Sequence, residues 1–502
     1  MKRRHSLCIA LLLCLPSLSM ADEIESDEAL QGRFSLETVH QTMGPIVADD
    51  TGVDSPADRW LSTRIMLSTQ FRPTSSLSLI AEGELRLYRA FDTGMDFGLD
   101  YGDDTLEFGR HQSARTAYWV PRQLSIQWTT SVGLFRCGHQ SAHWGTGLLV
   151  HDGKAARLFG DSWTGNRVER CVYGAKIGDH LTFFTGGDYV FRDDNAEHLE
   201  GDRAYGWTLG VRYLIDKASS KAKQSVISLL FAQRFQEDRL DPRQPDGTRT
   251  RLDVNSIDLY LKWVYPLRTG ASLLLESEMA IIFGETTRPY LEETFETGSD
   301  VLAAGGVLRF GYQGASVDAI LETGFASGDN DPQDATIRQF TFNRSYTVGL
   351  ILFEHVLPVV TARSVDRVTD PELLDVPPSG LRYTVNQGAV RNAFFLYPTF
   401  AWTPADNWSL RLAYLFAQRA SDALDVYQSA INGGYNTSLG GDQPGGRILG
   451  QEIDLGIDFE HRLGSLGYRI SVDGGVFYAG DAFAGIIDDP IYTTRVSAGI
   501  QW

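Results

Sequence analysis

Apolar and polar side chains alternate along many segments of this chain. Clear examples are residues 76–89, 408–419, 449–460, 466–478 and 491–502. A β-strand turns successive side chains to opposite faces, whereas a helix repeats its apolar positions about every 3.6 residues. The pattern therefore predicts an all-β protein whose strands have one apolar and one polar face. A soluble all-β protein with one hydrated face is the alternative.

The final segment, residues 491–502, indicates the cellular compartment of the protein. Its apolar face carries Tyr492, Thr494, Val496, Ala498, Ile500 and Trp502. It resembles the C-terminal strand of Gram-negative outer-membrane β-barrels, in which the terminal aromatic residue belongs to the assembly signal. This resemblance implies a protein of the cell outer membrane with its C-terminus in the periplasm.

The links between the alternating segments are short and long in turn. Short links lie near residues 73–74, 178–179, 266–269, 313–314, 404–407 and 463–465. Long polar links lie near residues 191–204, 237–250, 285–299, 327–344, 366–390, 420–448 and 480–490. Transmembrane barrels have tight periplasmic turns and long extracellular loops.

We therefore expect a transmembrane antiparallel up-and-down β-barrel of about 18 strands, within a range of 16 to 20, an even number being usual. Alternation is weakest in the first candidate strand, near residues 34–42, and in a candidate pair around residues 344–362.

The N-terminus predicts export from the cytoplasm. Lys2, Arg3 and Arg4 precede an apolar run, and Ser19-Met20-Ala21 provides a cleavage site. This is the layout of a secretory signal peptide, and the apolar run is too short to span a bilayer. We expect a signal peptide over 1–21, a partly disordered segment over 22–58 that holds the candidate first strand, and a barrel over 59–502. No separate plug domain is predicted.

Composition narrows the class further. No run of 18 apolar residues follows the signal peptide, which excludes a helical membrane protein but not a barrel. Net charge is −19 for the chain and becomes −22 without Lys2, Arg3 and Arg4. This charge argues against nucleic acid as a partner. Neither a cofactor nor a metal ion is expected.

Three stretches resemble the alginate-export family of outer-membrane barrels or a broader relative of it. They are GLFRCGHQSAHWGTGLL over residues 133–149, GQEIDLGID over 450–458 and GGVFYAGDAF over 474–483. The first resembles a barrel strand that runs into Gln and Trp-Gly. The resemblance implies passage of an anionic polysaccharide. The chain departs from the pattern because it is strongly acidic.

Charged side chains on the polar faces of the strands are candidates for the lumen wall. Pores that select ions carry rings of charged side chains. Two interpretations stay open: a network of ion pairs that stiffens the wall, or a ladder of arginines facing a ladder of acids across the lumen. The candidates are Arg86, Arg136, Arg212, Arg309, Arg411, Arg469, Arg495, Glu82, Glu84, Glu276, Glu452, Asp454 and Asp458.

Cys137 and Cys171 lie on consecutive predicted strands, near the ends that carry the long loops. An oxidising compartment favours a disulfide between them. Two free thiols facing lipid are the alternative, because the geometry of the two strands decides between them.

Other clusters carry weaker signals. Residues 327–334 concentrate Asp and Asn, which favours turns over a Ca²⁺ site. His139, Ser141 and His143 lack a nucleophile-elbow motif and an orienting acid, so catalysis is not expected.

The leading hypothesis is a porin-like outer-membrane channel or exporter for a hydrophilic solute such as an anionic polysaccharide. It would contact outer-membrane lipids and periplasmic or lipoprotein components. The alternative is a barrel that sheathes a partner, such as a multihaem electron conduit or a lipoprotein. An enzyme is the third class, and we do not expect one.

Overall fold

The structure is a computed structural model that describes residues 29–55, 59–90, 116–154, 157–160, 165–193, 195–216, 224–239, 249–287, 298–331, 334–368, 384–441 and 445–502. The predicted signal peptide lies outside these residues.

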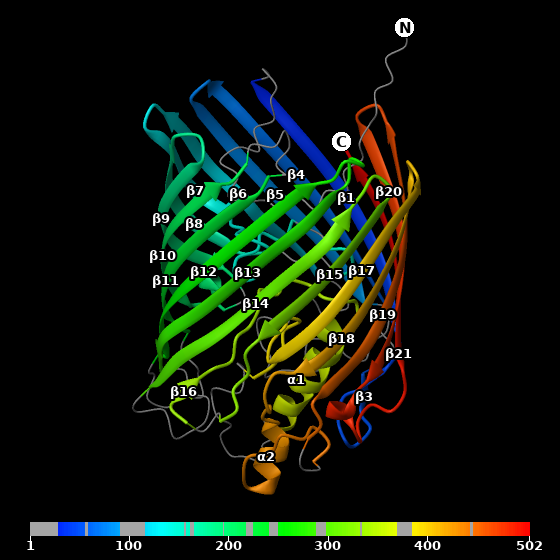
Figure 1. Cartoon of the computed structure of the whole chain (residues 1–502). Coiled ribbons are helices and arrows are strands. Elements are labelled where there is room, and N and C mark those ends of the chain that lie inside the picture. The colour runs from blue at the N-terminus through cyan, green and yellow to red at the C-terminus, as the bar shows by residue number, and fades with distance from the viewer. Residues whose placement is uncertain are drawn as a thin grey trace.

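Eighteen strands form a closed antiparallel barrel (Figure 1), which confirms the predicted fold class and strand number. Each strand pairs with the next along the chain, so the topology is up-and-down. The strands are β1 (Leu30–Met43), β4 (Arg59–Thr74), β5 (Leu77–Ala90), β6 (Thr116–Thr130), β7 (Gly133–Ser141), β8 (Arg167–Ile177), β9 (Leu181–Arg192), β10 (Arg203–Leu214), β11 (Val226–Glu237), β12 (Arg251–Pro266), β13 (Ser272–Thr286), β14 (Ser299–Gln313), β15 (Val317–Ala326), β17 (Ala393–Ala405), β18 (Trp408–Arg419), β19 (Ile448–Leu463), β20 (Leu466–Ala479) and β21 (Ile491–Gln501).

The barrel closes where its first strand meets its last. β1 pairs with β21 on one side and with β4 on the other, and His40 lies opposite Val496 across the seam. Beyond the end of β21, Trp502 N–H donates to the carbonyl of Phe34 at 2.9 Å, and Phe34 N–H donates to Trp502 at 2.8 Å. The weakly patterned candidate near residues 34–42 is thus part of a full strand of the wall.

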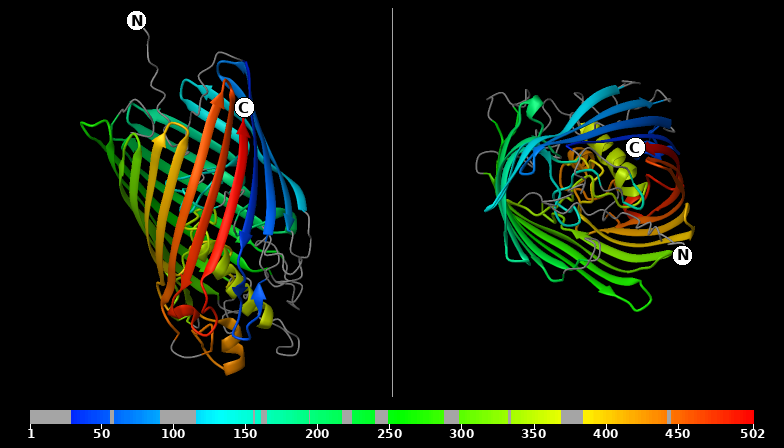
Figure 2. Two further views of the ribbon diagram at one scale, coloured as in Figure 1. Left: turned by 90° about the vertical axis from the view of Figure 1, so that its right-hand side faces the viewer. Right: turned by 90° about the horizontal axis from the view of Figure 1, so that it is seen from above.

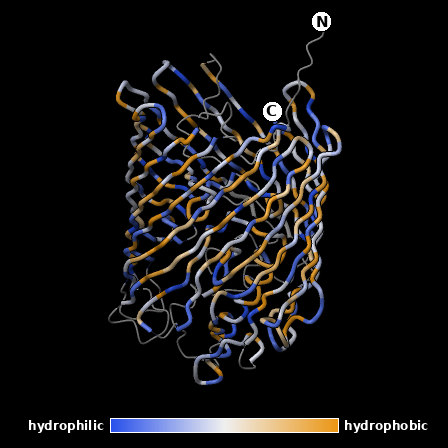
Figure 3. Tube along the Cα trace, viewed as in Figure 1, coloured by the Kyte–Doolittle hydropathy of each residue, from blue (hydrophilic) through white to orange (hydrophobic). Residues whose placement is uncertain are grey.

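The outer surface of the wall is apolar. Alternate residues of its strands expose large side chains such as Trp119, Leu124, Trp263 and Met279, and the hydropathy of the chain alternates along each strand (Figure 3). The intervening residues point inward and are mostly polar. Such a surface suits lipid on the outside and polar groups within. None of the described helices has the length and apolar character needed to cross a bilayer.

Short turns and long connections alternate around the barrel, as the sequence predicts. Turns at one end join β4 to β5, β6 to β7, β12 to β13, β17 to β18 and β19 to β20. The opposite end carries the long connections and the remaining elements. These elements are β2 (Ile46–Val47), β3 (Asp54–Ser55), β16 (Thr336–Ile337), α1 (Leu357–Val368), α2 (Val426–Asn432), the 3₁₀ turns His198–Glu200 and Asp481–Phe483, and the π-helical turn Leu352–Val356.

The predicted strand pair around residues 344–362 is wrong. The segment instead forms the π-helical turn Leu352–Val356, which continues directly into α1. Leu350, Ile351 and Leu352 are consecutive and all are buried, so the segment is covered on every side. A run of apolar residues does not distinguish a buried strand from a buried helix by periodicity.

Two long connections pack a hydrophobic core inside the barrel. The first follows β7, and the second lies between β15 and β17 and includes α1. Figure 2 shows α1 within the ring of strands. Leu148 and Phe159 of the first connection, Leu350 and Phe353 of the second, and Phe395 of β17 belong to one buried cluster. The described part of the lumen is therefore partly filled by the chain itself.

The stretch 133–149 combines a strand with the start of a connection. β7 ends at Ser141, and the remainder turns inward as the start of the first connection. Trp144 and Leu148 are buried there. The large apolar side chains after Ser141 therefore face the lumen core rather than lipid.

Candidate functional site

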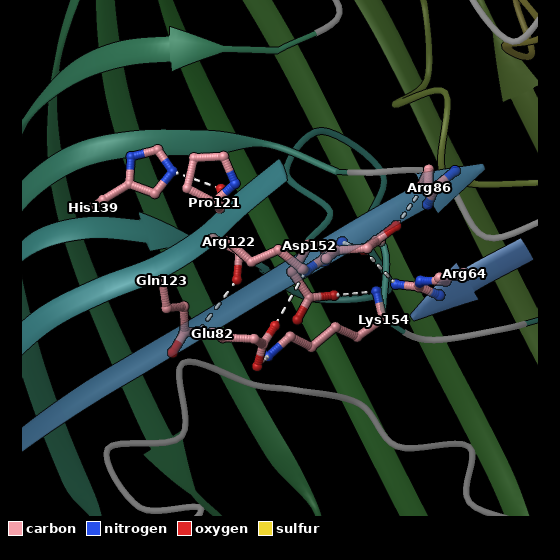
Figure 4. A network of polar contacts seen from close by, with 12 residues as sticks. Arg64, Glu82, Arg86, Pro121, Arg122, Gln123, His139, Asp152 and Lys154 are labelled. Carbon is pink, nitrogen blue, oxygen red and sulfur yellow. Dashed lines mark hydrogen bonds and ion pairs between the residues drawn. The ribbon is translucent and has the colours of Figure 1, made fainter. Parts of the chain in front are cut away.

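Glu84 of β5 is the centre of a buried charge cluster on the inner wall. Figure 4 shows its partners Arg64, Arg86 and Arg122. Glu84 accepts from Arg64 at 3.1 Å and from Arg122 at 2.7 Å, and it also pairs with Arg86. Glu84 and Arg122 have no exposed surface. Strands β4, β5 and β6 are neighbours, so alternate inward positions bring these side chains together.

Glu82, two residues along β5, connects the wall to the first inserted connection. Arg122 Nε lies 3.1 Å from Glu82, and Lys154 Nζ of the connection lies 2.8 Å from the same carboxylate. Arg122 also donates to the backbone carbonyl of Asp152. The two acids of β5 therefore hold both the wall and the inserted chain.

A second cluster joins β13, β14 and β15. Arg309 donates to Glu276 at 3.0 Å and to Glu322 at 2.9 Å. Glu322 also accepts from Arg157 of the first connection at 2.7 Å and from the Tyr346 hydroxyl of the second connection at 2.8 Å. One wall carboxylate thus contacts both inserted segments.

A third cluster lies on β18 to β21. Arg411 pairs with Asp458 at 2.6 Å and with Asp473 at 2.6 Å. Arg469 lies 2.6 Å from Asp458, and Arg495 lies 3.1 Å from Asp473. Two aspartates and three arginines alternate across neighbouring strands.

Glu452 and Asp454 of β19 have a different role from the arginine-paired acids. Glu452 accepts backbone N–H groups from Leu350 at 2.5 Å, Ile351 at 2.9 Å and Leu352 at 2.9 Å. Asp454 lies beside it, and among the described residues its two buried carboxylate oxygens interact with Glu452 and with no arginine or lysine. The wall thereby fixes the backbone that leads into α1.

Asp258 and Glu278 anchor the first connection in a similar way. Trp144 Nε1 donates to Asp258 at 3.0 Å. The Thr146 hydroxyl donates to Glu278 at 2.6 Å, and the Thr146 N–H donates to the same oxygen. Both acids are fully buried on the inner wall.

At the loop end of the barrel, arginines of α1 tie the helix to its surroundings by a partly buried ion pair and a cation–π contact. Arg363 donates to Asp49 at 2.8 Å, and Arg367 lies over the Tyr427 ring of α2 at 3.4 Å. Burial alone would raise the pKa of Asp49, but hydrogen bonds from Thr51 and Arg363 outweigh it and lower that pKa.

The predicted charged residues thus form networks on adjacent strands, which is the first of the two interpretations. Two candidates differ from the rest. Arg136 hydrogen-bonds only to neutral groups, Gln123 at 3.1 Å and Ser125 at 3.3 Å, and Arg212 has no ion pair with a described carboxylate.

Cys137 and Cys171 lie directly opposite each other on β7 and β8, with Cα atoms 4.1 Å apart, and are joined as a disulfide. Both are exposed on the outer face of the wall. They lie in the middle of their strands, and not near the ends that carry the long connections as the sequence suggested.

The three residues considered for catalysis, His139, Ser141 and His143, have separate partners. His139 bonds Glu169 at 2.6 Å and the Pro121 carbonyl at 2.9 Å, and Ser141 accepts from Gln123. His143 enters the inserted connection instead. No catalytic arrangement forms among these described residues.

In the described part of the Asp-rich segment, Asp329 is bound by backbone N–H groups, as in a turn. Asp329 accepts from the backbone N–H groups of Asp331 at 3.2 Å and Arg338 at 3.1 Å.

The residues that sequence reasoning missed belong mainly to the inserted connections. They include Trp144, Thr146, Lys154, Arg157 and Tyr346. One available signal was the run of large apolar residues in each long connection. A connection in water rarely contains such runs, because they expose apolar surface.

No protein-family model matches the chain, and no curated protein matches its sequence. The resemblance to the alginate-export family therefore has no support from either comparison.

Solved structures of three outer-membrane channels from Acinetobacter baumannii are similar to the whole chain. OccAB1 has a TM-score of 0.53 and 10% identity, covering 95% of this chain and 97% of its own. OccAB2 has a TM-score of 0.50 and 11% identity, covering 94% and 98%. OccAB4 has a TM-score of 0.50 and 9% identity, covering 95% and 98%. These likenesses show that the chain has the fold of a broader class of outer-membrane β-barrels.

Proposed function

We propose that this chain is a passive outer-membrane channel for a hydrophilic, anionic solute. The apolar outer wall and polar inner wall support a membrane-spanning pore. The observation that carries the choice of charge is a group of inward-facing cations, Arg136, Lys176, Arg212 and Lys262. None of these four has a described carboxylate oxygen within 4.0 Å, although Lys262 lies opposite Glu276 and Arg136 lies near Glu82, whereas most of the other wall arginines are in direct ion pairs.

These four cations, the unpaired cations, lie on β7, β8, β10 and β12, on one side of the wall. Lys176 of β8 is opposite Thr182 of β9, which is opposite Arg212 of β10. Strands are spaced by about 4.8 Å, so Lys176 and Arg212 stand roughly 10 Å apart across the sheet. Fixed positive charge on a low-dielectric wall attracts anions and repels cations.

Paired arginines contribute less to such a field. Arg309 is held between Glu276 and Glu322, and Arg411 between Asp458 and Asp473. Each of these arginines has two carboxylates beside it, so their charges largely cancel for a passing solute. The selectivity of the proposed channel therefore depends on the unpaired cations rather than on the total number of arginines.

Planar-bilayer recording tests this function. The purified barrel is expected to conduct, and its reversal potential in a KCl gradient should show preference for chloride. Arg212→Gln together with Lys262→Gln should shift the reversal potential toward that of a nonselective pore. Arg447→Gln, an exposed arginine paired with Asp422 at the loop end, is the matched control. A closed barrel, or one that prefers potassium, would contradict the proposal.

Export of an anionic polysaccharide, as the alginate-export resemblance implies, is a narrower form of this proposal. The unpaired cations suit a uronate monomer and its polymer equally. Liposome swelling separates the two, because entry of the monomer without entry of the oligomer would exclude polysaccharide passage. The sheath hypothesis has less support, because the chain's own segments occupy part of the lumen that a partner would need.

A further inference from the structure

His143, His151 and Asp152 come together inside the first inserted connection. Each offers a ligand atom, and these atoms lie within 4.8 Å of one another. His143 Nδ1 is 3.7 Å from Asp152 Oδ1, and the two imidazole rings have centroids 4.8 Å apart. The exposed fractions of the three residues are 6%, 2% and 5%. Sequence reasoning compared His143 with His139 and so did not find this group.

His143 is the unusual member of this group. Both of its ring nitrogens are buried, and neither makes a hydrogen bond of ordinary geometry in the described structure, although the Gly145 backbone lies close by. A neutral imidazole has one donor and one acceptor nitrogen, and leaving such groups unsatisfied in a protein interior is costly. A buried histidine that faces another histidine and a carboxylate, with its own nitrogens unmet, points to a missing ligand.

The backbone leaves room for the two rings to approach each other. Gly147 lies between them with φ +91°, and a Cβ there would come within 2.2 Å of His151 and 3.1 Å of His143. Any other residue at 147 would therefore meet both rings. The glycine that permits the turn is also what lets the two histidines converge.

The connection that carries the group is fixed to the wall at several points. Trp144 is bonded to Asp258, Thr146 to Glu278, and the Asp152 carbonyl to Arg122. His151 N–H donates to Asn166 at 2.9 Å. A site whose ligands are held in place binds an ion with less loss of conformational freedom.

We propose that His143, His151 and Asp152 bind a zinc ion. Two imidazoles and one carboxylate form a ligand set typical of Zn²⁺, whereas Ca²⁺ and Mg²⁺ prefer oxygen alone. With Zn–N and Zn–O distances near 2.0 to 2.2 Å, tetrahedral ligands stand about 3.4 Å apart. The 3.7 Å between His143 and Asp152 is close to that separation, and small side-chain rotations bring the remaining atoms within range.

Binding exchanges one interaction for another at His151. Gly153 N–H donates to His151 Nδ1 at 2.9 Å. A neutral imidazole that gives one nitrogen to the ion carries its proton on the other, so this hydrogen bond is lost whichever nitrogen binds. In return, His143 gains a partner. The ion would join two points of the connection eight residues apart and so fix its path through the lumen.

Metal analysis of a tag-free, detergent-purified barrel tests the site. After removal of metals by a chelator and dialysis against Zn²⁺, the wild-type chain is expected to retain one zinc per chain. Competition with a chromophoric chelator should show at least tenfold weaker affinity in His143→Gln and in His151→Gln, a loss of the order seen on disturbing metal sites. His180→Gln, which removes an exposed histidine of a short turn, should bind zinc as the wild type does.

Two results would overturn the site. One is wild-type protein without zinc above background, and the other is His143→Gln with wild-type affinity, which would indicate adventitious surface binding. The heat-dependent gel shift of folded barrels checks each variant. If His143→Gln does not fold, Asp152→Asn takes its place, since its backbone carbonyl still bonds Arg122. Zinc should also raise the unfolding temperature of the wild type and of His180→Gln, but not that of His143→Gln or His151→Gln. None of these readouts depends on conduction, so the zinc site and the channel can fail separately.

Discussion

Glu84 shows how the inner wall tolerates charge away from water. A buried carboxylate is costly unless it is paired and hydrogen-bonded. Glu84 has three arginines around it, and Arg122 in turn reaches Glu82. The pairs are interdependent, because removing one charge leaves another without compensation in a site that water does not reach.

Glu84→Gln should therefore destabilise the barrel by about 3 to 5 kcal/mol, the range for breaking a buried pair from one side. Denaturant unfolding in detergent, followed by tryptophan fluorescence, measures the loss. Glu460→Gln is the matched control, because Glu460 is half exposed and its bond to Arg469 is 3.3 Å. An exposed pair contributes less than about 1 kcal/mol. Equal losses for the two variants would contradict the special role of Glu84.

The alternation of side chains between the two faces of a strand predicted which charged residues face the lumen. Arg86, Glu276 and Asp458 are examples. The alternation could not predict their partners. Glu452 binds backbone N–H groups of a segment about 100 residues away. Partner identity depends on the path of the inserted connections, which leaves no periodic signal in the sequence.

At the scale of elements, the helix α2 illustrates how burial changes the pKa of a residue that caps a helix. Asp425 accepts from Gln428 N–H at 2.7 Å as the N-cap of α2. Burial raises the pKa of Asp425 to about 6, although the hydrogen bond from Gln428 opposes the shift. The free residue has a pKa near 3.9, so the folded loop holds a proton that the unfolded loop releases between those values.

Raising the pH from 4 to 6 should consequently weaken the α2 loop, and the loss is complete above pH 6. About two pKa units correspond to roughly 3 kcal/mol as an upper limit. Hydrogen exchange of α2, corrected for intrinsic rates, should show opening that becomes easier across this window. Asp425→Asn keeps the cap and should abolish the dependence. A pH dependence that persists in the variant would assign it to another group.

The disulfide joins two neighbouring strands of the wall. Cys137 and Cys171 are 34 residues apart in sequence, and a closed loop of that size lowers the entropy of the unfolded chain by the equivalent of about 4 kcal/mol. The denatured protein should resist alkylation at both residues until a reductant is added, as mass spectrometry would show. Alkylation without reductant would establish free thiols.

Strands with clear alternation were predictable because each residue faces either lipid or the lumen. The segment around Leu350, Ile351 and Leu352 was not, since these consecutive residues are all buried within the barrel. The same chemistry, a run of Val, Leu, Ile and Phe, suits a buried strand and a buried helix equally. Only the surroundings decide, and the surroundings are built from distant parts of the chain.

At the scale of the whole molecule, the barrel has two stabilising systems. Backbone hydrogen bonds close the wall, and a hydrophobic core inside it holds the inserted connections. Phe353 lies at the centre of that core, beside Phe395 at a ring separation of 6.3 Å. The two systems meet at the wall acids but rest on different interactions.

Phe353→Ala should loosen the inserted segments and leave the wall closed. Loss of a buried Phe costs about 3 to 5 kcal/mol, so single-channel currents should become larger or noisier while the gel shift of the folded barrel persists. Leu455→Ala, on the lipid-facing side, is the control and should conduct as the wild type does. Wild-type currents in Phe353→Ala would show that this core does not control the opening.

The seam between β1 and β21 also constrains how the protein is made. Its partners, such as Leu36 and Ile500, are separated by almost the entire chain, so neither can pair before the last strand is delivered. Until then the growing sheet has two open edges, which can pair with other chains. Contacts between such distant residues form slowly. An assembling chain therefore depends on protection of both edges up to its final dozen residues.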